Sequence, residues 1–196
     1  MKYISYFIFA AFIVVTLLFL RNALKPSDEP LLITGVEKCG ECHKLKMLGN
    51  QLEVWQNSAH AKAYKSLLSE KASEFTAKNN LELPADNKVC LKCHTTEHFL
   101  KDFDKQPGYK TDEGVGCEAC HGAGSKYSPA ELHKEEEQFK KFGGIVGSEE
   151  TCLKCHSPKG NKEQKVMENV CPFQLEDFVY KPALEKIKHL VNKDNF

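Results

Sequence analysis

The sequence predicts a mainly α-helical fold with extensive loops. Apolar side chains recur at mixed helical spacing in residues 51–68, without the alternation typical of strands. A second helical pattern covers residues 182–192, where Pro182 suits the first turn. Eight glycines between residues 108 and 147 mark turns. Short helices separated by irregular chain are therefore expected.

The pattern Cys-x-x-Cys-His occurs four times, at residues 39–43, 90–94, 117–121 and 152–156. It is typical of covalent attachment of a c-type haem. Two thiols three positions apart on a helical turn can form thioethers to both haem vinyl groups, and the next imidazole becomes the proximal iron ligand. Four covalently bound haem c groups are therefore predicted. The thioether residues would be Cys39, Cys42, Cys90, Cys93, Cys117, Cys120, Cys152 and Cys155, and the proximal ligands His43, His94, His121 and His156.

Structural zinc is the alternative reading of paired cysteines, because CxxC knuckles also bind that metal. Zinc does not require histidine after every second cysteine, and a chain with eight histidines in 196 residues would rarely place four there by chance. Haem is therefore favoured. The ninth cysteine, Cys171, belongs to no motif and is expected to be a small buried residue or a thiol for an intermolecular disulfide.

The composition favours a core built from cofactor. The 196 residues suit one domain, and the part after the apolar N-terminus is charged and only moderately apolar. Such a chain is marginal on its own, and four packed porphyrins would supply the missing apolar mass. Residues 37–196 are thus predicted to form a multihaem cytochrome c domain that unfolds without haem.

The N-terminus predicts a membrane anchor. Residues 3–20 form an apolar run of 18 residues interrupted only by Ser5 and Thr16, a length that suits a membrane-spanning helix. A cleaved signal peptide is the alternative, but its apolar stretch is usually shorter and ends at small residues. Residues 1–21 are therefore assigned to a single transmembrane helix.

The following residues 22–36 contain prolines and charged side chains, and they are predicted to be an extended tether. Because c-type cytochromes are assembled outside the cytoplasmic membrane, the haem domain is expected on its periplasmic side. After residue 25 the chain has 24 basic and 27 acidic residues, a net charge of −3. No dense basic patch suggests nucleic acid. Redox proteins, including a membrane complex, are the expected partners.

The histidine count matches the motif count. Of eight histidines, four follow the motif cysteines, and the others are His60, His98, His133 and His189. Two imidazoles on one iron are a common ligation, which gives lower potentials than a Met/His pair. The four remaining histidines are therefore candidate distal ligands.

His98 differs from the other candidates. It follows His94 by four residues, so on a continuing helix both side chains would project from the same face. His98 could then not reach the far side of its own haem. It could serve another haem or lie near one as a proton donor.

The chain resembles the cytochrome c-554 family of tetrahaem c-type cytochromes. The similarity runs from about Cys39 to His189, and it is most specific in WQNSAHAKA at residues 55–63 and GVGCEACHGAG at residues 114–124. This family is known from ammonia-oxidising bacteria, where it accepts electrons from hydroxylamine oxidoreductase.

The resemblance implies a ligand set. Three haems of the family have two histidine ligands, and the haem of the second motif is five-coordinate. By position, the distal ligands would be His133 on the first haem, His60 on the third and His189 on the fourth. His98 and the N-terminal anchor are where this chain departs from the family.

Two functions follow. The first is electron transfer between a membrane or periplasmic donor and acceptor, which needs the haems and no catalytic group. The second is an enzyme or ligand-binding protein that acts on nitric oxide, nitrite or hydroxylamine at an open haem, with His98, Lys92 or Tyr109 as candidate proton donors. Electron transfer is favoured because haem ligation alone accounts for the motifs. A filament-forming cytochrome is a weaker third alternative.

Overall fold

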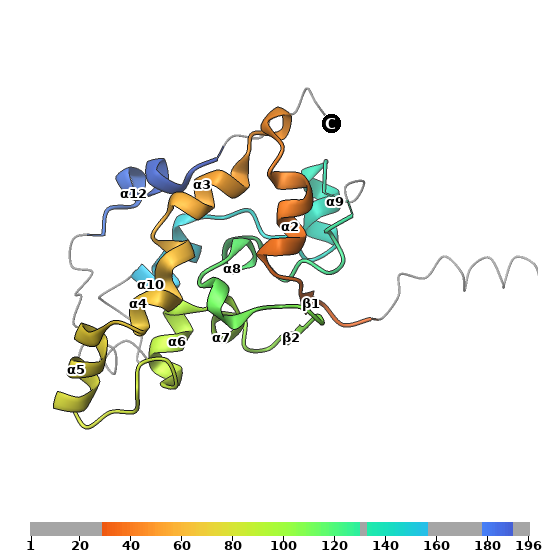
Figure 1. Cartoon of the computed structure of the whole chain (residues 1–196). Helices are drawn as coiled ribbons and strands as arrows, with labels where there is room; N and C mark the ends of the chain where they lie inside the picture. Colours follow the sequence, from red (N-terminus) through yellow and green to blue (C-terminus); the bar gives the residue numbers. More distant parts are fainter. Residues whose placement is uncertain (1–28, 130–132, 157–177, 190–196) are drawn as a thin grey trace, which may run out of the picture. The chain divides into compact units, whose positions relative to one another are not determined.

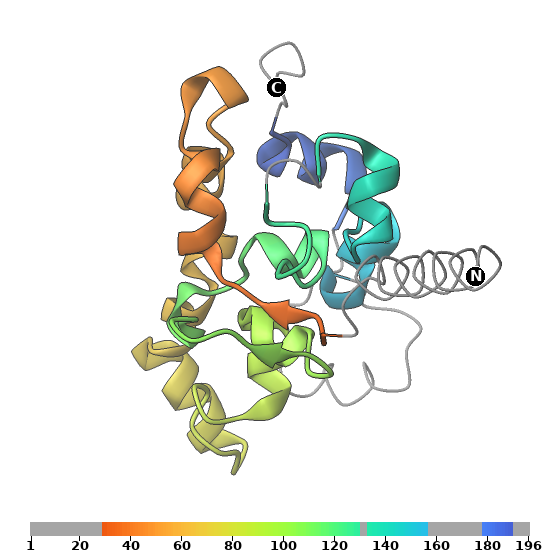
Figure 2. The same cartoon turned by 90° about the vertical axis from the view of Figure 1, so that its right-hand side faces the viewer.

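A computed structural model describes residues 29–129, 133–156 and 178–189 (Figure 1). The chain divides into two compact units, Met1–Pro30 and Leu31–Phe196, and the elements below belong to the second. The α-helices are α2 (Val36–His43), α3 (Gln51–Asn57), α4 (Ala63–Leu67), α5 (Glu70–Lys78), α6 (Lys88–His94), α7 (Thr96–Phe99), α8 (Cys117–His121), α9 (Glu136–Lys141), α10 (Glu149–His156) and α12 (Tyr180–Ile187). The 3-10 helices are η1 (Lys46–Leu48), η2 (His60–Lys62) and η3 (Thr111–Glu113), and the strands are β1 (Leu32–Ile33) and β2 (Asp104–Lys105). The described residues confirm the mainly helical, loop-rich fold (Figures 1 and 2).

A short parallel ribbon joins the start of the second unit to a distant loop. β1 pairs with β2 in the register Leu32 to Asp104 and Ile33 to Lys105, and both views show the two strands side by side (Figures 1 and 2). Ile33 is completely buried. The last residues of the predicted tether are thus part of the folded unit. Two-residue strands are too short to show alternation, which is why the sequence did not predict them.

The helix predicted over residues 51–68 is divided into α3, η2 and α4. The break comes at Ser58, whose backbone is extended with φ −80° and ψ 165°. The Ser58 hydroxyl donates to the carbonyl of Trp55 at 2.7 Å and accepts from the N–H of His60 at 3.2 Å. This local alternative to helical bonding is typical of serine and redirects the chain before His60.

The second predicted helix, over residues 182–192, is α12. It begins at Tyr180 and ends at Ile187, where Lys188 turns the backbone to ψ 129°. Pro182 lies in its first turn, as predicted. The expected end at residue 192 lies outside the described residues.

The polypeptide core is small. In the described residues the buried hydrophobic side chains are Ile33, Val36, Leu67, Leu91, Ala119, Ala123 and Tyr127. Large apolar side chains remain exposed, including those of Leu45, Met47, Ile145, Val146 and Leu153 beside the motifs. A domain of this size normally buries more apolar surface. The predicted cofactor core fits this arrangement.

In the described part of the chain, none of the helices has both the length and the apolar character needed to span a bilayer. The predicted anchor at residues 1–21 lies outside that part, as does Cys171. Both remain predictions.

Candidate haem-binding site

Each Cys-x-x-Cys-His motif occupies the end of a helix. The motif histidines His43, His94, His121 and His156 are the last residues of α2, α6, α8 and α10, respectively. A helical turn places the two cysteines of a motif on neighbouring faces of the helix. All eight motif cysteines are free thiols. The geometry suits attachment of two vinyl groups near one imidazole.

Three of the four motif histidines lie beside a second imidazole. The ring centroids of His43 and His133 are 5.9 Å apart. The same distance separates His60 from His156 and His121 from His189. Each pair thus joins one motif histidine to one of the remaining histidines.

The spacing of these pairs suits axial ligation of one metal ion. Metal–nitrogen bonds of about 2.0 Å, added to the half-widths of two imidazole rings, place centroids about 6 Å apart across the metal. Stacked or hydrogen-bonded rings could also adopt such a distance. In the pairs of His43 and His121, the hydrogen bonds of the outer nitrogens favour ligation, whereas Nδ1 of His156 in the third pair is buried without a hydrogen-bond partner.

The outer nitrogen, Nδ1, is bonded to an oxygen in both rings of two pairs. Nδ1 of His121 donates to the Ile145 carbonyl at 3.1 Å, and that of His189 to the Ile187 carbonyl at 3.2 Å. In the first pair the partners of His43 and His133 are the Gln51 side-chain oxygen at 3.0 Å and the Pro129 carbonyl at 3.1 Å. A carbonyl oxygen only accepts, so Nδ1 carries the proton and Nε2 keeps the lone pair that a metal needs.

Burial also favours the neutral imidazole. Desolvation lowers the pKa of His43, His60, His121 and His156. The neighbouring imidazoles have a smaller effect in the same direction for the first three of these residues. Metal ligation requires a neutral ring, so these four imidazole side chains are suited to it.

The structure exchanges two of the predicted pairs. His60 lies beside His156 of the fourth motif, and His189 lies beside His121 of the third. The expected pairs, His60 with the third haem and His189 with the fourth, are therefore wrong. The contact between His133 and His43 agrees with the expected first pair. Sequence order cannot reveal such long-range contacts, because the chain must fold before they form.

The second motif is different. Nδ1 of His94 lies 2.7 Å from the Ala63 carbonyl and 3.2 Å from the Ser66 hydroxyl. Among residues 29–129, 133–156 and 178–189, no second imidazole is in ring contact with His94. Its Nε2 side is thus the one motif position in these ranges without a histidine pair.

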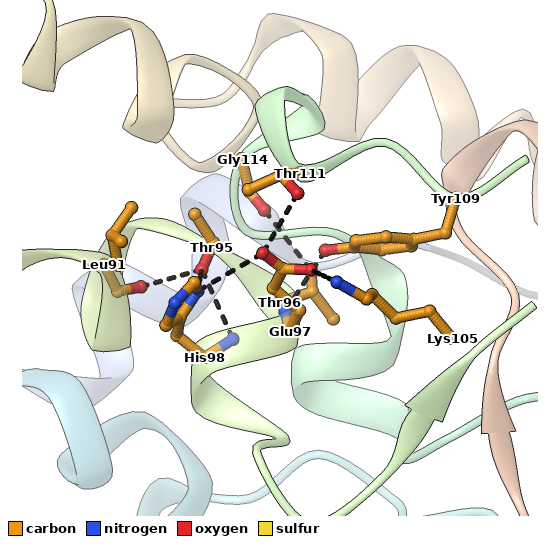
Figure 3. Close-up of polar contacts among 9 residues, drawn as sticks. All are labelled: Leu91, Thr95, Thr96, Glu97, His98, Lys105, Tyr109, Thr111 and Gly114. Atoms are coloured by element: carbon orange, nitrogen blue, oxygen red, sulfur yellow. Dashed lines mark hydrogen bonds and ion pairs between the residues drawn. The ribbon is translucent and has the colours of Figure 1, made fainter. Parts of the chain in front are cut away.

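His98 lies in a polar network next to the second motif (Figure 3). α6 ends at His94, and Thr95 is extended with φ −141° and ψ 150° before α7 begins. The helix thus does not continue from His94 to His98, and the condition under which both side chains would share one face is not met. The Thr95 hydroxyl accepts from the His98 N–H at 3.3 Å and lies 3.0 Å from its Nδ1.

Glu97 connects this network to the loop that carries β2. Its carboxylate accepts from Lys105 Nζ at 2.5 Å and Thr111 Oγ1 at 2.9 Å, and it lies 3.4 Å from His98 Nδ1 (Figure 3). The Glu97 N–H donates to the Tyr109 hydroxyl at 3.1 Å. Two neighbours in sequence, Thr95 and Glu97, therefore hold the His98 side chain in place.

The attachment cysteines of different motifs are neighbours. The thiols of Cys39 and Cys117 share a hydrogen bond that, together with burial, raises the pKa of Cys117. A second hydrogen bond joins Cys93 and Cys155, which lowers the pKa of Cys93 and raises that of Cys155. The first motif therefore adjoins the third, and the second adjoins the fourth.

The third and fourth motifs are linked as well. Burial, and after it the charge of Cys152, raises the pKa of Cys120. Cys120 in turn contributes to the raised pKa of Cys155. The attachment points thus follow one another in space in the order first, third, fourth, second motif.

Residues of the site that the sequence did not suggest include Glu118 and Gln51. Glu118 lies inside the third motif and is 1% exposed. The carbonyls that orient the histidines have no sequence signal, since every residue has one.

The zinc alternative has no support in the described residues. In those ranges, no group of three or more His, Cys, Asp and Glu side chains could hold a metal ion. A structural zinc site needs four such ligands. Imidazole pairs fit a porphyrin iron instead, because the macrocycle supplies the other four nitrogens.

Comparison with known proteins gives a consistent result. Residues 38–122 match the family model described as cytochrome c554 and c-prime. Cytochrome c-554 of Nitrosomonas europaea is 31% identical over 143 residues, which are 62% of this chain and 56% of that protein. The chain thus spans little more than half of this curated relative.

A solved structure is also similar. The reduced state of cytochrome c554 from Nitrosomonas europaea aligns with a TM-score of 0.48 and 25% identity, over 68% of this chain and 69% of that chain. The family implies covalently bound haem c. The resemblance predicted from the motifs is thus confirmed: residues 38–122 match the cytochrome c554 family model, and the chain is similar to cytochrome c-554 of Nitrosomonas europaea.

Proposed function

We propose that the protein is a membrane-anchored tetrahaem c-type cytochrome that transfers electrons between a membrane or periplasmic donor and acceptor. The observation that carries this proposal is the set of three imidazole pairs, each with ring centroids 5.9 Å apart. Each pair contains one motif histidine. Bis-imidazole ligation is a common feature of electron-transfer haems, and electron transfer requires no catalytic side chain.

In this proposal the motifs hold the haems as follows. The first haem would be bound between His43 and His133, and the third between His121 and His189. The fourth would be bound between His156 and His60. When bound, each haem supplies a one-electron couple between ferric and ferrous iron.

The polypeptide would keep the structural reorganisation of the haem ligands during electron transfer small. The bonds from His121 to Ile145 and from His189 to Ile187 fix both rings of one pair against rotation. Trp55 on α3 donates from its indole N–H to the Val115 carbonyl at 2.8 Å, which ties α3 to the segment before α8. Ligands held in this way change little when the charge of the site changes.

The neighbouring thiols support a linear electron path. Cys39 adjoins Cys117, Cys120 adjoins Cys152, and these contacts join the first, third and fourth motifs. The hydrogen bond between Cys155 and Cys93 extends the series to the second motif. Electrons would enter at one end of this series and leave at the other.

Small-molecule binding at the second haem is a second candidate function. It is favoured by the lack of an imidazole partner for His94 among the described residues, in contrast to the other motif histidines. An open iron there would bind nitric oxide, nitrite or hydroxylamine, and His98 would be the nearby proton donor. Consumption of one of these molecules by the reduced protein, at a rate that falls in His98→Ala, would support this function over simple electron transfer.

The test of the cofactor proposal is a haem count on the purified protein. Mass spectrometry should show four covalently added haems, and the absorption spectrum of the pyridine complex should give the same number per chain. The electron-transfer proposal predicts that all four are reduced and reoxidised by soluble redox proteins without net consumption of nitrogen oxides. Fewer than four covalent haems would contradict the proposal.

The membrane proposal rests on the apolar run of residues 3–20. After lysis without detergent, the holoprotein should sediment with the membrane and dissolve only in detergent. A chain in which a cleavable secretion signal replaces residues 1–21 is the matched control, and it should be recovered in the periplasmic fraction. Recovery of the unaltered protein in that fraction would support a cleaved signal instead.

A further inference from the structure

A half-buried glutamate with one fully buried oxygen lies between the segments that lead into the helices of the first and third motifs. Glu113 ends η3, four residues before Cys117, and its Oε2 accepts from the N–H of Val36 at the start of α2 at 3.0 Å. Its other oxygen, Oε1, is buried and has no hydrogen-bond partner. Burying an unpaired ionised oxygen is costly, and addition of a proton removes that cost.

The adjacent Glu118 has a different environment. Its carboxylate accepts from the N–H groups of Thr34, Gly35 and Gly124 at 2.8, 2.7 and 2.6 Å, and also from the Thr34 hydroxyl at 3.2 Å. All of these partners are donors, so the group acts only as an acceptor, as an ionised carboxylate does. Two neighbouring acids in unequal surroundings commonly divide the roles of fixed charge and proton acceptor.

The charges around Glu113 favour its protonated form. Burial raises its pKa to about 7, the Val36 N–H opposes this, and the nearby Glu118 and Asp112 raise it further. Lys110 lowers it only weakly, and that ammonium is paired with Glu37 of α2 at 2.9 Å.

The remaining titratable neighbours do not stabilise the ionised form of Glu113. The Tyr109 ring approaches Gly35 next to the Glu113 carboxylate, and the charge of Glu113 contributes to raising the pKa of Tyr109. On the side of α8, the same charge raises the pKa of Cys117, after the Cys39 hydrogen bond and burial. Glu113 therefore acts electrostatically at the thiol that would anchor the third haem.

We propose that Glu113 is a proton-binding site coupled to the haem on Cys117, so that the protein takes up a proton at this carboxyl group when that haem is reduced. This inference rests on the proposed function, because it requires haem at the third motif. The electron comes from the redox donor and converts ferric to ferrous iron, and the proton comes from solvent and converts the carboxylate to the acid. The net charge of the haem and Glu113 together is then unchanged. By linkage, a proton on Glu113 must favour reduction to the same extent that reduction favours the proton.

The test is a redox titration of the holoprotein at several pH values around 7, with each haem followed by its absorption and magnetic resonance signals. The potential of one haem should fall as the pH rises, and this slope should disappear in Glu113→Gln. The matched control is Glu70→Gln, which removes an exposed acid of the same charge from α5 and should keep the slope. A slope that survives in Glu113→Gln would overturn the proposal.

A second measurement does not depend on the variant being stable. Infrared difference spectra of the wild-type protein upon reduction at pH 7 should show the carbonyl stretch of a newly protonated carboxylic acid. This band should shift when glutamate is labelled with ¹³C while the cells receive unlabelled 5-aminolevulinate as the haem precursor, which distinguishes it from haem propionates. Absence of the labelled band would overturn the proposal. If haem were not bound at all, the proposed function would fail first, and the haem count would show it.

Discussion

At the residue scale, the histidines determine what the molecule can do. Nδ1 of His133 is bonded to the Pro129 carbonyl, and its ring lies 5.9 Å from that of His43. His98 instead lies against Thr95 and Glu97 on its own turn. These two histidines therefore have different surroundings, in line with the sequence analysis, which distinguished His98 from the other candidates.

Removal of the first pair should change one iron only. We expect His133→Ala to convert one low-spin ferric haem to high spin, because Nε2 of His133 would no longer occupy the sixth position. The count of high-spin signals in electron paramagnetic resonance measures this. His98→Ala is the matched control and should leave the count unchanged, and an increase there would instead make His98 a ligand.

A second prediction at this scale concerns Glu118. Its carboxylate joins the turn before α2 to Gly124 by accepting hydrogen bonds from three backbone N–H groups. In Glu118→Gln the amide NH₂ would face one of these N–H groups, and the loss of a charged acceptor should lower the free energy of unfolding by about 2–3 kcal/mol. Denaturant unfolding of the holoprotein measures this loss.

The control for that variant is Glu41→Gln. Glu41 forms an exposed ion pair with Lys38 at 2.7 Å, and such pairs contribute little. Its removal should not measurably change stability. Equal destabilisation by both variants would show that Glu118 has no special structural role.

At the element scale, the sequence predicts where helices occur better than where they end. The four motif helices and α12 follow from motif spacing and apolar periodicity. The breaks at Ser58 and Thr95 depend on side-chain hydroxyls that bond to nearby backbone or histidine groups. Serine and threonine permit such bonds at many positions, so the sequence does not identify which ones form.

The partners of the distal histidines were predictable only in part. The first pair could be assigned by family position, while the other two are exchanged. Each partner depends on contacts between segments far apart in sequence, such as the bond of 3.1 Å from the Val115 N–H to the His60 carbonyl. No local pattern encodes such contacts.

Substitution of Gly114 tests the close contact between the segment before α8 and η2. It has a positive φ of 84°, and a Cβ there would lie 2.6 Å from the His60 carbonyl oxygen. Gly114→Ala should therefore displace His60 from His156 as well as strain the backbone. The expected outcome is an additional high-spin haem and a loss of unfolding free energy of at least about 2–3 kcal/mol.

Gly108→Ala is the matched control for this substitution. Gly108 has a similar φ of 95°, but a Cβ there would meet nothing within 4 Å. It shares the backbone strain, about 1–2 kcal/mol, without the clash. If both variants lost the same stability and gained no high-spin signal, the contact between Gly114 and His60 would not support the fourth pair.

At the scale of the whole molecule, the folded unit Leu31–Phe196 has few buried apolar side chains in its described part, and several large ones beside the motifs are exposed. Porphyrin would cover these side chains and supply most of the core. Folding and cofactor attachment should therefore be one process.

The chain produced without haem attachment should accordingly be unfolded. Circular dichroism of protein made in the cytoplasm, away from the attachment machinery, should show little helix and no cooperative thermal transition. The holoprotein is the reference and should unfold cooperatively. A helical apoprotein with a sharp transition would mean that the polypeptide core is sufficient by itself.

The most direct test of the proposed ligation is low-temperature electron paramagnetic resonance of the fully oxidised holoprotein. The three imidazole pairs and the single His94 predict three low-spin haems and one high-spin haem per chain. Four low-spin haems would contradict the open second site. More than one high-spin haem would contradict the three pairs.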